Sequence, residues 1–118
     1  MESGDKPITI ETNSNRVRVL YKGRVVADTT RALTLKETGL PPVQYFPRAD
    51  ADMSLLQRTA HQTHCGYKGD AAYYTIKTDD GMAENAVWTY EDPYPAVAAI
   101  KGHLAFYPDR VDRIEEVT

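Results

Sequence analysis

The residues best suited to chemistry are concentrated between Thr63 and Asp70, in the order Thr-His-Cys-Gly-Tyr-Lys-Gly-Asp. This segment gathers an imidazole, a thiol and an ammonium group around two glycines, which permit positive φ angles or a close approach of backbone to a ligand. Lys68 offers a point charge for a phosphate or a carboxylate. The alternative is a plain strand connection with Lys68 in solvent, since Tyr21-Lys22-Gly23 repeats the same tripeptide in a predicted hairpin.

Cys65 is a candidate nucleophile. A catalytic thiol needs a lowered pKa, which usually comes from a neighbouring imidazolium, another cation or a helix N-terminus. His64 is adjacent in sequence, but neighbouring side chains on a strand point to opposite faces, so His61 or His103 would have to supply the partner. A lone cysteine is more often a small buried apolar residue. The sequence leaves both interpretations open.

The sequence also contains possible metal ligands and a carboxylate that could take part in chemistry. His61-x-x-His64-Cys65 contains ligand types that zinc accepts, but a structural zinc site takes four ligands and no Cys-x-x-Cys pair is present, so we expect no metal site. Glu37 ends an apolar run just before a turn. There it could act as a general base, pair with a buried Lys or Arg, or simply be solvated.

Aromatic residues are the last chemical signal, with eight Tyr, one Trp and two Phe in the chain. Most of them are expected to build the core of a small β domain. Alternation along strands nevertheless turns some outward, where tyrosine hydroxyls and an indole can line a pocket. The predicted ligand-binding set is Tyr45, Tyr67, Lys68, Trp88 and Tyr90, and the candidate catalytic set is Glu37, Cys65 and Lys68.

The elements that must position these residues are mainly strands. Residues 16–20 and 24–28 alternate around Lys22-Gly23 and predict a hairpin. Further strands are expected at residues 32–37, 43–46, 71–78, 84–90 and 104–107, with Val97–Ile100 in a second hairpin-like unit and His61–Gly69 rich in turns. Asp50 or Asp52 can cap one short helix that ends near Thr59. Residues 1–14 are expected to be flexible, and residues 15–118 to form a single mainly β domain of antiparallel strands, an open barrel or a tent-like arrangement.

The composition of the chain limits the classes of partner that it is expected to bind. The chain has 118 residues, a formal charge of −3 and a pI near 5.5, so no basic field is available for nucleic acid and none is expected to bind. No apolar stretch approaches the roughly 20 residues of a membrane helix, and the N-terminus lacks signal-peptide order, so no membrane partner is expected. A single cysteine excludes an intramolecular disulfide and favours the cytoplasm. The oligomeric state stays open between a monomer and a homodimer.

The motifs also follow one family pattern in order. The chain resembles the domain of unknown function 427 family over about residues 16–107, through Gly23-x-x-x-Ala27-Asp28, Glu37, Tyr45-Phe46-Pro47, Cys65-x-Tyr67-Lys68-Gly69-x-Ala71, Trp88-x-Tyr90-x-x-Pro93 and Ile100-x-Gly102-x-x-Ala105-Phe106-Tyr107. The resemblance implies a compact antiparallel β fold similar to the β-tent folds that elsewhere hold zinc, here without their cysteine pairs. Gly66 stands where the family pattern usually has proline.

Three functions follow from these residues, and none of them names a reaction or a cofactor. The first is binding of a small anionic molecule, bearing a phosphate or a carboxylate, in a pocket lined by Lys68 and aromatic side chains. The second is an enzyme that uses the same pocket, with Glu37 and Lys68 as an acid–base pair or Cys65 as nucleophile. The third is an interaction module that pairs through a β edge without catalysis. The nucleotidyltransferase-like label that the resembled family carries in some classifications lacks support in paired carboxylates or a Gly-Ser loop.

Overall fold

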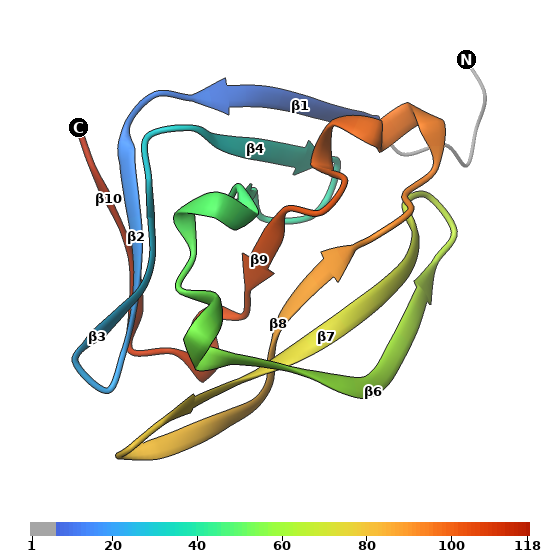
Figure 1. Ribbon diagram of the computed structural model, residues 1–118. Coiled ribbons are helices and arrows are strands. Elements are labelled where there is room, and N and C mark those ends of the chain that lie inside the picture. Colours follow the sequence, from blue (N-terminus) through green and yellow to red (C-terminus); the bar gives the residue numbers. More distant parts are fainter. Residues whose placement is uncertain (1–6) are drawn as a thin grey trace.

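The computed structural model describes residues 7–118, and strands account for most of its regular structure (Figure 1). These strands are β1 (Ile8–Asn13), β2 (Arg16–Tyr21), β3 (Arg24–Thr29), β4 (Ala32–Glu37), β5 (Val43–Tyr45), β6 (Leu56–Cys65), β7 (Gly69–Thr78), β8 (Gly81–Tyr90), β9 (Leu104–Phe106) and β10 (Arg113–Val117). Within the described residues they form three sheets, ordered β1-β4-β5, β10-β2-β3 and β6-β7-β8-β9, and every paired neighbour is antiparallel. The predicted mainly β, antiparallel fold is confirmed, and the sheets do not close into a barrel.

The predicted hairpin at residues 16–28 is confirmed as β2 and β3. Lys22 and Gly23 connect the strands, with φ angles of 51° and 76°. A two-residue turn with both φ angles positive matches the right-handed twist of the strands that it joins. Along β2, Val17 and Val19 are buried while Arg16 is exposed, so the period-two pattern separates core from solvent as expected.

The expectation of a flexible segment through residue 14 is wrong for Ile8–Asn13. These residues form β1, which pairs with β4 from Ile8 opposite Glu37 to Asn13 opposite Ala32. Ile8 and Ile10 also pack against buried side chains of β4 and its neighbours. A β-branched run with apolar residues at alternate positions pairs readily with a partner strand, even in a polar context. Residues 1–6 of the predicted flexible segment lie outside the described residues.

The expected short helix after Asp50 is replaced by two 3₁₀ turns, η1 (Arg48–Asp50) and η2 (Met53–Leu55). Asp52 does cap η2, because its carboxylate accepts a hydrogen bond of 3.1 Å from the Ser54 backbone N–H. The helix cannot continue, since Leu56 already begins strand pairing with Ile76 of β7. The expected cap at Asp50 is also wrong, because that carboxylate accepts from the Thr29 hydroxyl at 2.7 Å.

Strand β6 occupies much of the segment that was expected to be turns. It runs to Cys65, so His61–Cys65 are extended and only residues 66–68 form the turn to β7. The strand lies at the edge of its sheet, and most of its side chains are exposed. An exposed edge strand carries no alternation of apolar and polar residues, which is why the sequence pattern missed it.

The last third of the chain differs from expectation at one place. Val97–Ile100 belong to the 3₁₀ segment η3 (Pro95–Ile100) and bury Val97 and Ile100, so they form no second hairpin. A further turn, η4 (Pro108–Arg110), follows β9. The C-terminal residues, whose apolar spacing of three left their state open, form β10 against β2.

The sheets β1-β4-β5 and β6-β7-β8-β9 meet at the short strands β5 and β9. Phe46 and Leu104 exchange backbone hydrogen bonds of 2.8 and 2.9 Å, which join the end of β5 to the start of β9. One buried cluster lies around Val19, Phe46 and Ile76, and a second contains Leu35, Tyr45, Ala71, Tyr73, Tyr90, Val97, Ile100 and Ala105. The second cluster carries most of the aromatic residues predicted to line a pocket.

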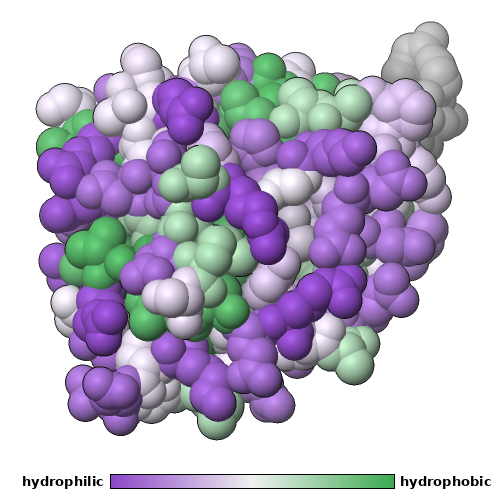
Figure 2. All heavy atoms as spheres, viewed as in Figure 1, coloured by the Kyte–Doolittle hydropathy of each residue, from purple (hydrophilic) through white to green (hydrophobic). Residues whose placement is uncertain are grey.

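Polar residues cover much of the face drawn in Figure 2, and apolar residues gather there in smaller patches between them. Isolated apolar side chains on a surface are normal, since polar atoms are too few to cover a folded protein completely. Within residues 7–118, no helix has the length and apolar content that crossing a membrane requires.

Candidate functional site

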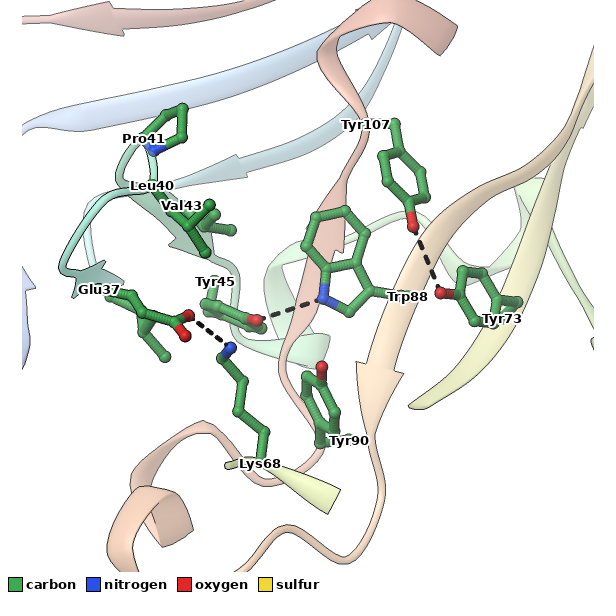
Figure 3. A pocket seen from close by; sticks show the side chains of 11 residues that line it. Glu37, Leu40, Pro41, Val43, Tyr45, Lys68, Tyr73, Trp88, Tyr90 and Tyr107 are labelled. Atoms are coloured by element: carbon green, nitrogen blue, oxygen red, sulfur yellow. Dashed lines mark hydrogen bonds and ion pairs between the residues drawn. The ribbon is translucent and has the colours of Figure 1, made fainter. Parts of the chain in front are cut away.

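A cavity of about 230 Å³ lies where the ends of β4, β5 and β8 approach the turn between β6 and β7 (Figure 3). Glu37 is the last residue of β4, Tyr45 ends β5, and Trp88 and Tyr90 lie two residues apart on β8. The complete lining consists of Leu35, Glu37, Leu40, Pro41, Val43, Tyr45, Lys68, Tyr73, Trp88, Tyr90 and Tyr107. Residues distant in sequence are therefore brought to one small concave site.

Lys68 and Glu37 form a buried ion pair in this cavity. The Lys68 Nζ atom lies 2.8 Å from Glu37 Oε1, and the two side chains are only 10% and 6% exposed (Figure 3). Pairing of Glu37 with a buried Lys or Arg was one interpretation of the sequence, and contact of Lys68 with a ligand was another. The structure brings the two residues together, 31 positions apart in the chain.

The backbone on both sides of Lys68 fixes the direction of its side chain. Its N–H donates to the Cys65 carbonyl at 3.3 Å, and its own carbonyl accepts from the Tyr94 N–H at 2.9 Å. Gly69 follows with a φ of 114°, a conformation that L side chains rarely adopt, and an added Cβ would lie 3.5 Å from the Asp92 carbonyl oxygen. The turn is therefore held against the 92–94 loop, and the ammonium group points inward rather than into solvent.

Cys65 lies beside the ion pair and is half-buried. Its Sγ atom is 3.8 Å from Lys68 Nζ, which is the contact that a weak sulfur acceptor makes with an ammonium donor. Cys65 also packs against the second buried cluster, but its side chain does not line the cavity. The position fits a packing residue that supports Lys68 better than an exposed nucleophile.

The histidines proposed as partners of Cys65 make other contacts. His64 Nδ1 lies 2.7 Å from Asp70 Oδ1 on the exposed side of the β6–β7 hairpin, as the alternation of side chains along a strand requires. The His61 ring packs edge-on to Tyr73, and His103 Nδ1 lies 3.1 Å from the Lys101 carbonyl oxygen. Over residues 7–118, no group of three or more His, Cys, Asp or Glu side chains is arranged to hold a metal ion.

Hydroxyl and indole groups form the rest of the polar lining. Trp88 Nε1–H donates to the Tyr45 hydroxyl at 3.2 Å, and the Tyr73 and Tyr107 hydroxyls lie 3.3 Å apart (Figure 3). Sequence reasoning selected Tyr45, Trp88 and Tyr90 for the pocket but missed Tyr73 and Tyr107. Strand register could have identified Tyr73, because it lies directly opposite Trp88 in the β7–β8 pair.

Burial keeps three phenols of the lining protonated. It raises the pKa of Tyr45 to about 12, although the N–H that Trp88 donates partly offsets this effect. Burial, strengthened by the contact with Tyr73, also raises the pKa of Tyr107 to about 12, and burial raises the pKa of Tyr90 above its usual value. The cavity therefore presents the neutral hydroxyl groups of Tyr45, Tyr90 and Tyr107 beside the Lys68–Glu37 pair.

One predicted ligand-binding residue lies elsewhere. Tyr67 is 38% exposed and does not line the cavity, although it adjoins Lys68 in sequence. Leu35, Leu40, Pro41 and Val43 supply apolar walls that no sequence signal had assigned to a site. The apolar wall and the polar lining together are what small-molecule sites usually combine.

A small antiparallel β domain with an aromatic cavity around a buried Lys–Glu pair is the class of protein that these features define. The family model described as a domain of unknown function (DUF427) matches residues 9–117, so the chain belongs to that family, as the resemblance had implied. A comparison with curated proteins found no match to the chain.

Proposed function

We propose that the cavity around Glu37 and Lys68 binds a small molecule that carries an anionic group. The supporting observation is the ion pair itself, which lies in the wall of a cavity rather than within solid core. Such a pair contributes little net stability, because the cost of removing both charges from water offsets their attraction. A buried ion pair in a cavity wall is therefore a candidate for ligand recognition or for chemistry.

Lys68 supplies the charge for the anion. An ammonium group has three N–H donors, and contacts with Glu37 Oε1 and Cys65 Sγ account for two of them among the described residues. The third can donate to an anion in the cavity while the Glu37 contact is kept. Glu37 thus orients Lys68 and balances its charge in the absence of a ligand.

The tyrosines complete the anion site. Tyr45 accepts from Trp88, so its own O–H is available as a donor, and its raised pKa keeps that proton in place. The hydroxyls of Tyr73 and Tyr107 lie within the same lining. The Lys68 ammonium group and the Tyr45 hydroxyl come from different elements to one side of the Trp88 ring, while the apolar wall around Val43 accommodates the uncharged part of the ligand (Figure 3).

Calorimetric titration of the wild type and of Lys68→Met with acetate, benzoate and inorganic phosphate tests this proposal. Losing a charged hydrogen bond costs about 1.5–3 kcal/mol, so Lys68→Met should bind the preferred anion roughly tenfold more weakly or worse. Lys22→Met is the matched control, since Lys22 occupies the same Tyr-Lys-Gly tripeptide but is exposed. Equal anion affinity in wild type and Lys68→Met contradicts the proposed role of Lys68.

A second candidate function is acid–base catalysis on a ligand in the same cavity. The 2.8 Å separation of Glu37 Oε1 and Lys68 Nζ is short enough for a proton to pass between them or on to a substrate. Once a ligand is identified, Glu37→Gln separates the two candidates. A binder keeps measurable affinity in that variant and shows no turnover in the wild type, whereas an enzyme loses turnover.

A further inference from the structure

A second hollow adjoins the polar cavity. This groove has a volume of about 530 Å³ and is lined by Leu40, Pro41, Pro42, Val43, Gln44, Trp88, Phe106, Pro108, Arg113 and Ile114. Four of these residues, Leu40, Pro41, Val43 and Trp88, also line the polar cavity. The two hollows therefore share a wall formed by the segment before β5 and by one indole ring.

Trp88 lines both hollows. Its Nε1–H donates to Tyr45 at 3.2 Å, and its ring packs 4.5 Å from the Tyr107 ring, centroid to centroid; both tyrosines line the polar cavity. A ligand that spans both hollows would follow the shared wall from the charged groups to an apolar surface.

The groove is mainly apolar. Five of its ten lining residues are prolines or aromatic residues, namely Pro41, Pro42, Pro108, Trp88 and Phe106. Among the described lining residues, Arg113 alone is charged, and its Nε atom already contacts Glu115 Oε2 at 2.9 Å. Flat proline and aromatic surfaces suit a planar ring, which loses little conformational freedom on binding, better than a flexible chain.

Size also indicates that the two hollows serve one ligand. Sites for small molecules usually enclose roughly 300–1,000 Å³. The polar cavity, at about 230 Å³, is below that range, whereas the adjoining groove lies within it. A charged group fits the first hollow and the larger apolar body requires the second.

The charges in the polar cavity favour a singly charged anion over a doubly charged one. Glu37 lies 2.8 Å from the Lys68 ammonium, so the pair carries no net charge before a ligand enters. A doubly charged phosphate would meet the repulsion of the Glu37 carboxylate with a single cation to offset it. A carboxylate carries one negative charge and needs only the remaining N–H of Lys68 and a phenol donor.

We infer that the ligand class of this protein is an aryl carboxylate, with its carboxylate at Lys68 and its ring system in the groove along Trp88. The inference rests on the proposed anion-binding function and extends it by naming the body of the ligand. The groove supplies affinity in proportion to the apolar area that the ring covers. Affinity should therefore rise with the number of fused rings at constant head group.

The test compares acetate, benzoate and 2-naphthoate by calorimetric titration, with two matched proline variants. Pro108→Glu introduces a carboxylate at the groove, where Pro108 is exposed at the first position of η4. Pro95→Glu is the control, because Pro95 is exposed at the first position of η3 and lines neither hollow. Both substitutions leave buried side chains in place, so both variants should fold.

We expect 2-naphthoate to bind the wild type at least about tenfold more tightly than acetate does, as burial of a ring system predicts. Pro108→Glu should remove most of that advantage, and Pro95→Glu should keep it. Equal affinities for acetate and 2-naphthoate overturn the groove inference but leave the anion site intact. A third outcome is that Pro108→Glu weakens 2-naphthoate binding whereas Lys68→Met does not change it. The groove then binds the ring without help from Lys68, which overturns the inference that one ligand occupies both hollows. Absence of binding by every carboxylate overturns the aryl-carboxylate inference, and absence of phosphate binding as well overturns the proposed anion-binding function.

Discussion

Breaking the Lys68–Glu37 pair from one side should destabilise the protein more than removing both charges together. Lys68→Met leaves the Glu37 carboxylate in a site where its side chain is 6% exposed, without its partner at 2.8 Å. Glu37→Met leaves the ammonium group in the corresponding state. The double variant replaces both charges with apolar side chains of similar length, which leaves no unpaired charge in the cavity wall.

The expected magnitude follows from burial. Removing one partner of a buried pair costs about 3–5 kcal/mol, and the lower end applies because Lys68 retains 10% exposure at a cavity. Unfolding entropy of about 2.1 cal/mol/K per residue gives about 0.25 kcal/mol/K for 118 residues. A loss of about 3 kcal/mol therefore lowers Tm by about 12 °C, whereas the double variant should stay within about 1 kcal/mol of the wild type.

Thermal and urea unfolding of the wild type, both single variants and the double variant form a double-mutant cycle that tests this prediction. Arg58→Met is the control, because Arg58 and Glu91 form an ion pair of similar length, 2.9 Å, with side chains 53% and 50% exposed. Solvent screens that pair, so its loss should hardly change Tm. If Lys68→Met is no more harmful than Arg58→Met, or if the double variant is as unstable as the singles, the reasoning from burial is refuted.

Further predictions concern the turn, the phenols and the thiol. Gly69→Ala should lose about 1–3 kcal/mol in urea unfolding, because its φ of 114° strains any L side chain, whereas Gly66→Ala, with no atom within 4 Å of the added Cβ, should be nearly neutral. Since burial raises the pKa of Tyr45 to about 12 from about 10 in the unfolded chain, its contribution to stability is complete below pH 10 and is lost as pH rises through 12. Ultraviolet titration should therefore lose a late-ionising phenol in Tyr45→Phe; an unchanged titration curve would contradict this expectation. Cys65, half-buried beside the ion pair, should react with iodoacetamide more slowly in the native protein than in urea; equal rates would show that the thiol is accessible.

The sequence predicted well those strands in which apolar and polar residues alternate, and it predicted poorly those that lack this alternation. β2 and β4 carry apolar residues on one face, and their predicted bounds agree closely with the structure. β6 lies at a sheet edge with exposed side chains, so the same criterion assigned its residues to a helix and to turns. Burial on one face creates the periodic signal, and an edge strand without such a face lacks it.

The residues of the cavity were also predicted well where strand alternation indicated them and poorly where a turn or the strand register decides their position. Tyr45, Trp88 and Tyr90 were predicted because alternation along strands turns some aromatic residues away from the core, where they can line a pocket, and all three line the cavity. Tyr67 was included in the same aromatic set, yet it lies outside the cavity lining in the turn beside Lys68. Tyr107 was missed because its position depends on how β9 registers against β8, which no local pattern specifies.

The two Tyr-Lys-Gly tripeptides show how one local sequence gives an exposed lysine in one place and a buried lysine in another. In Tyr21-Lys22-Gly23 the lysine has a φ of 51°, lies in a two-residue hairpin turn and is exposed. In Tyr67-Lys68-Gly69 the lysine is the last residue of the turn at 66–68, and its carbonyl accepts from the Tyr94 N–H. That contact, together with the Glu37 carboxylate at the end of β4, holds the second lysine in the interior. The buried position of Lys68 therefore depends on two segments that lie 31 residues before it and 26 residues after it, because a buried ammonium group is strongly destabilising without a carboxylate partner.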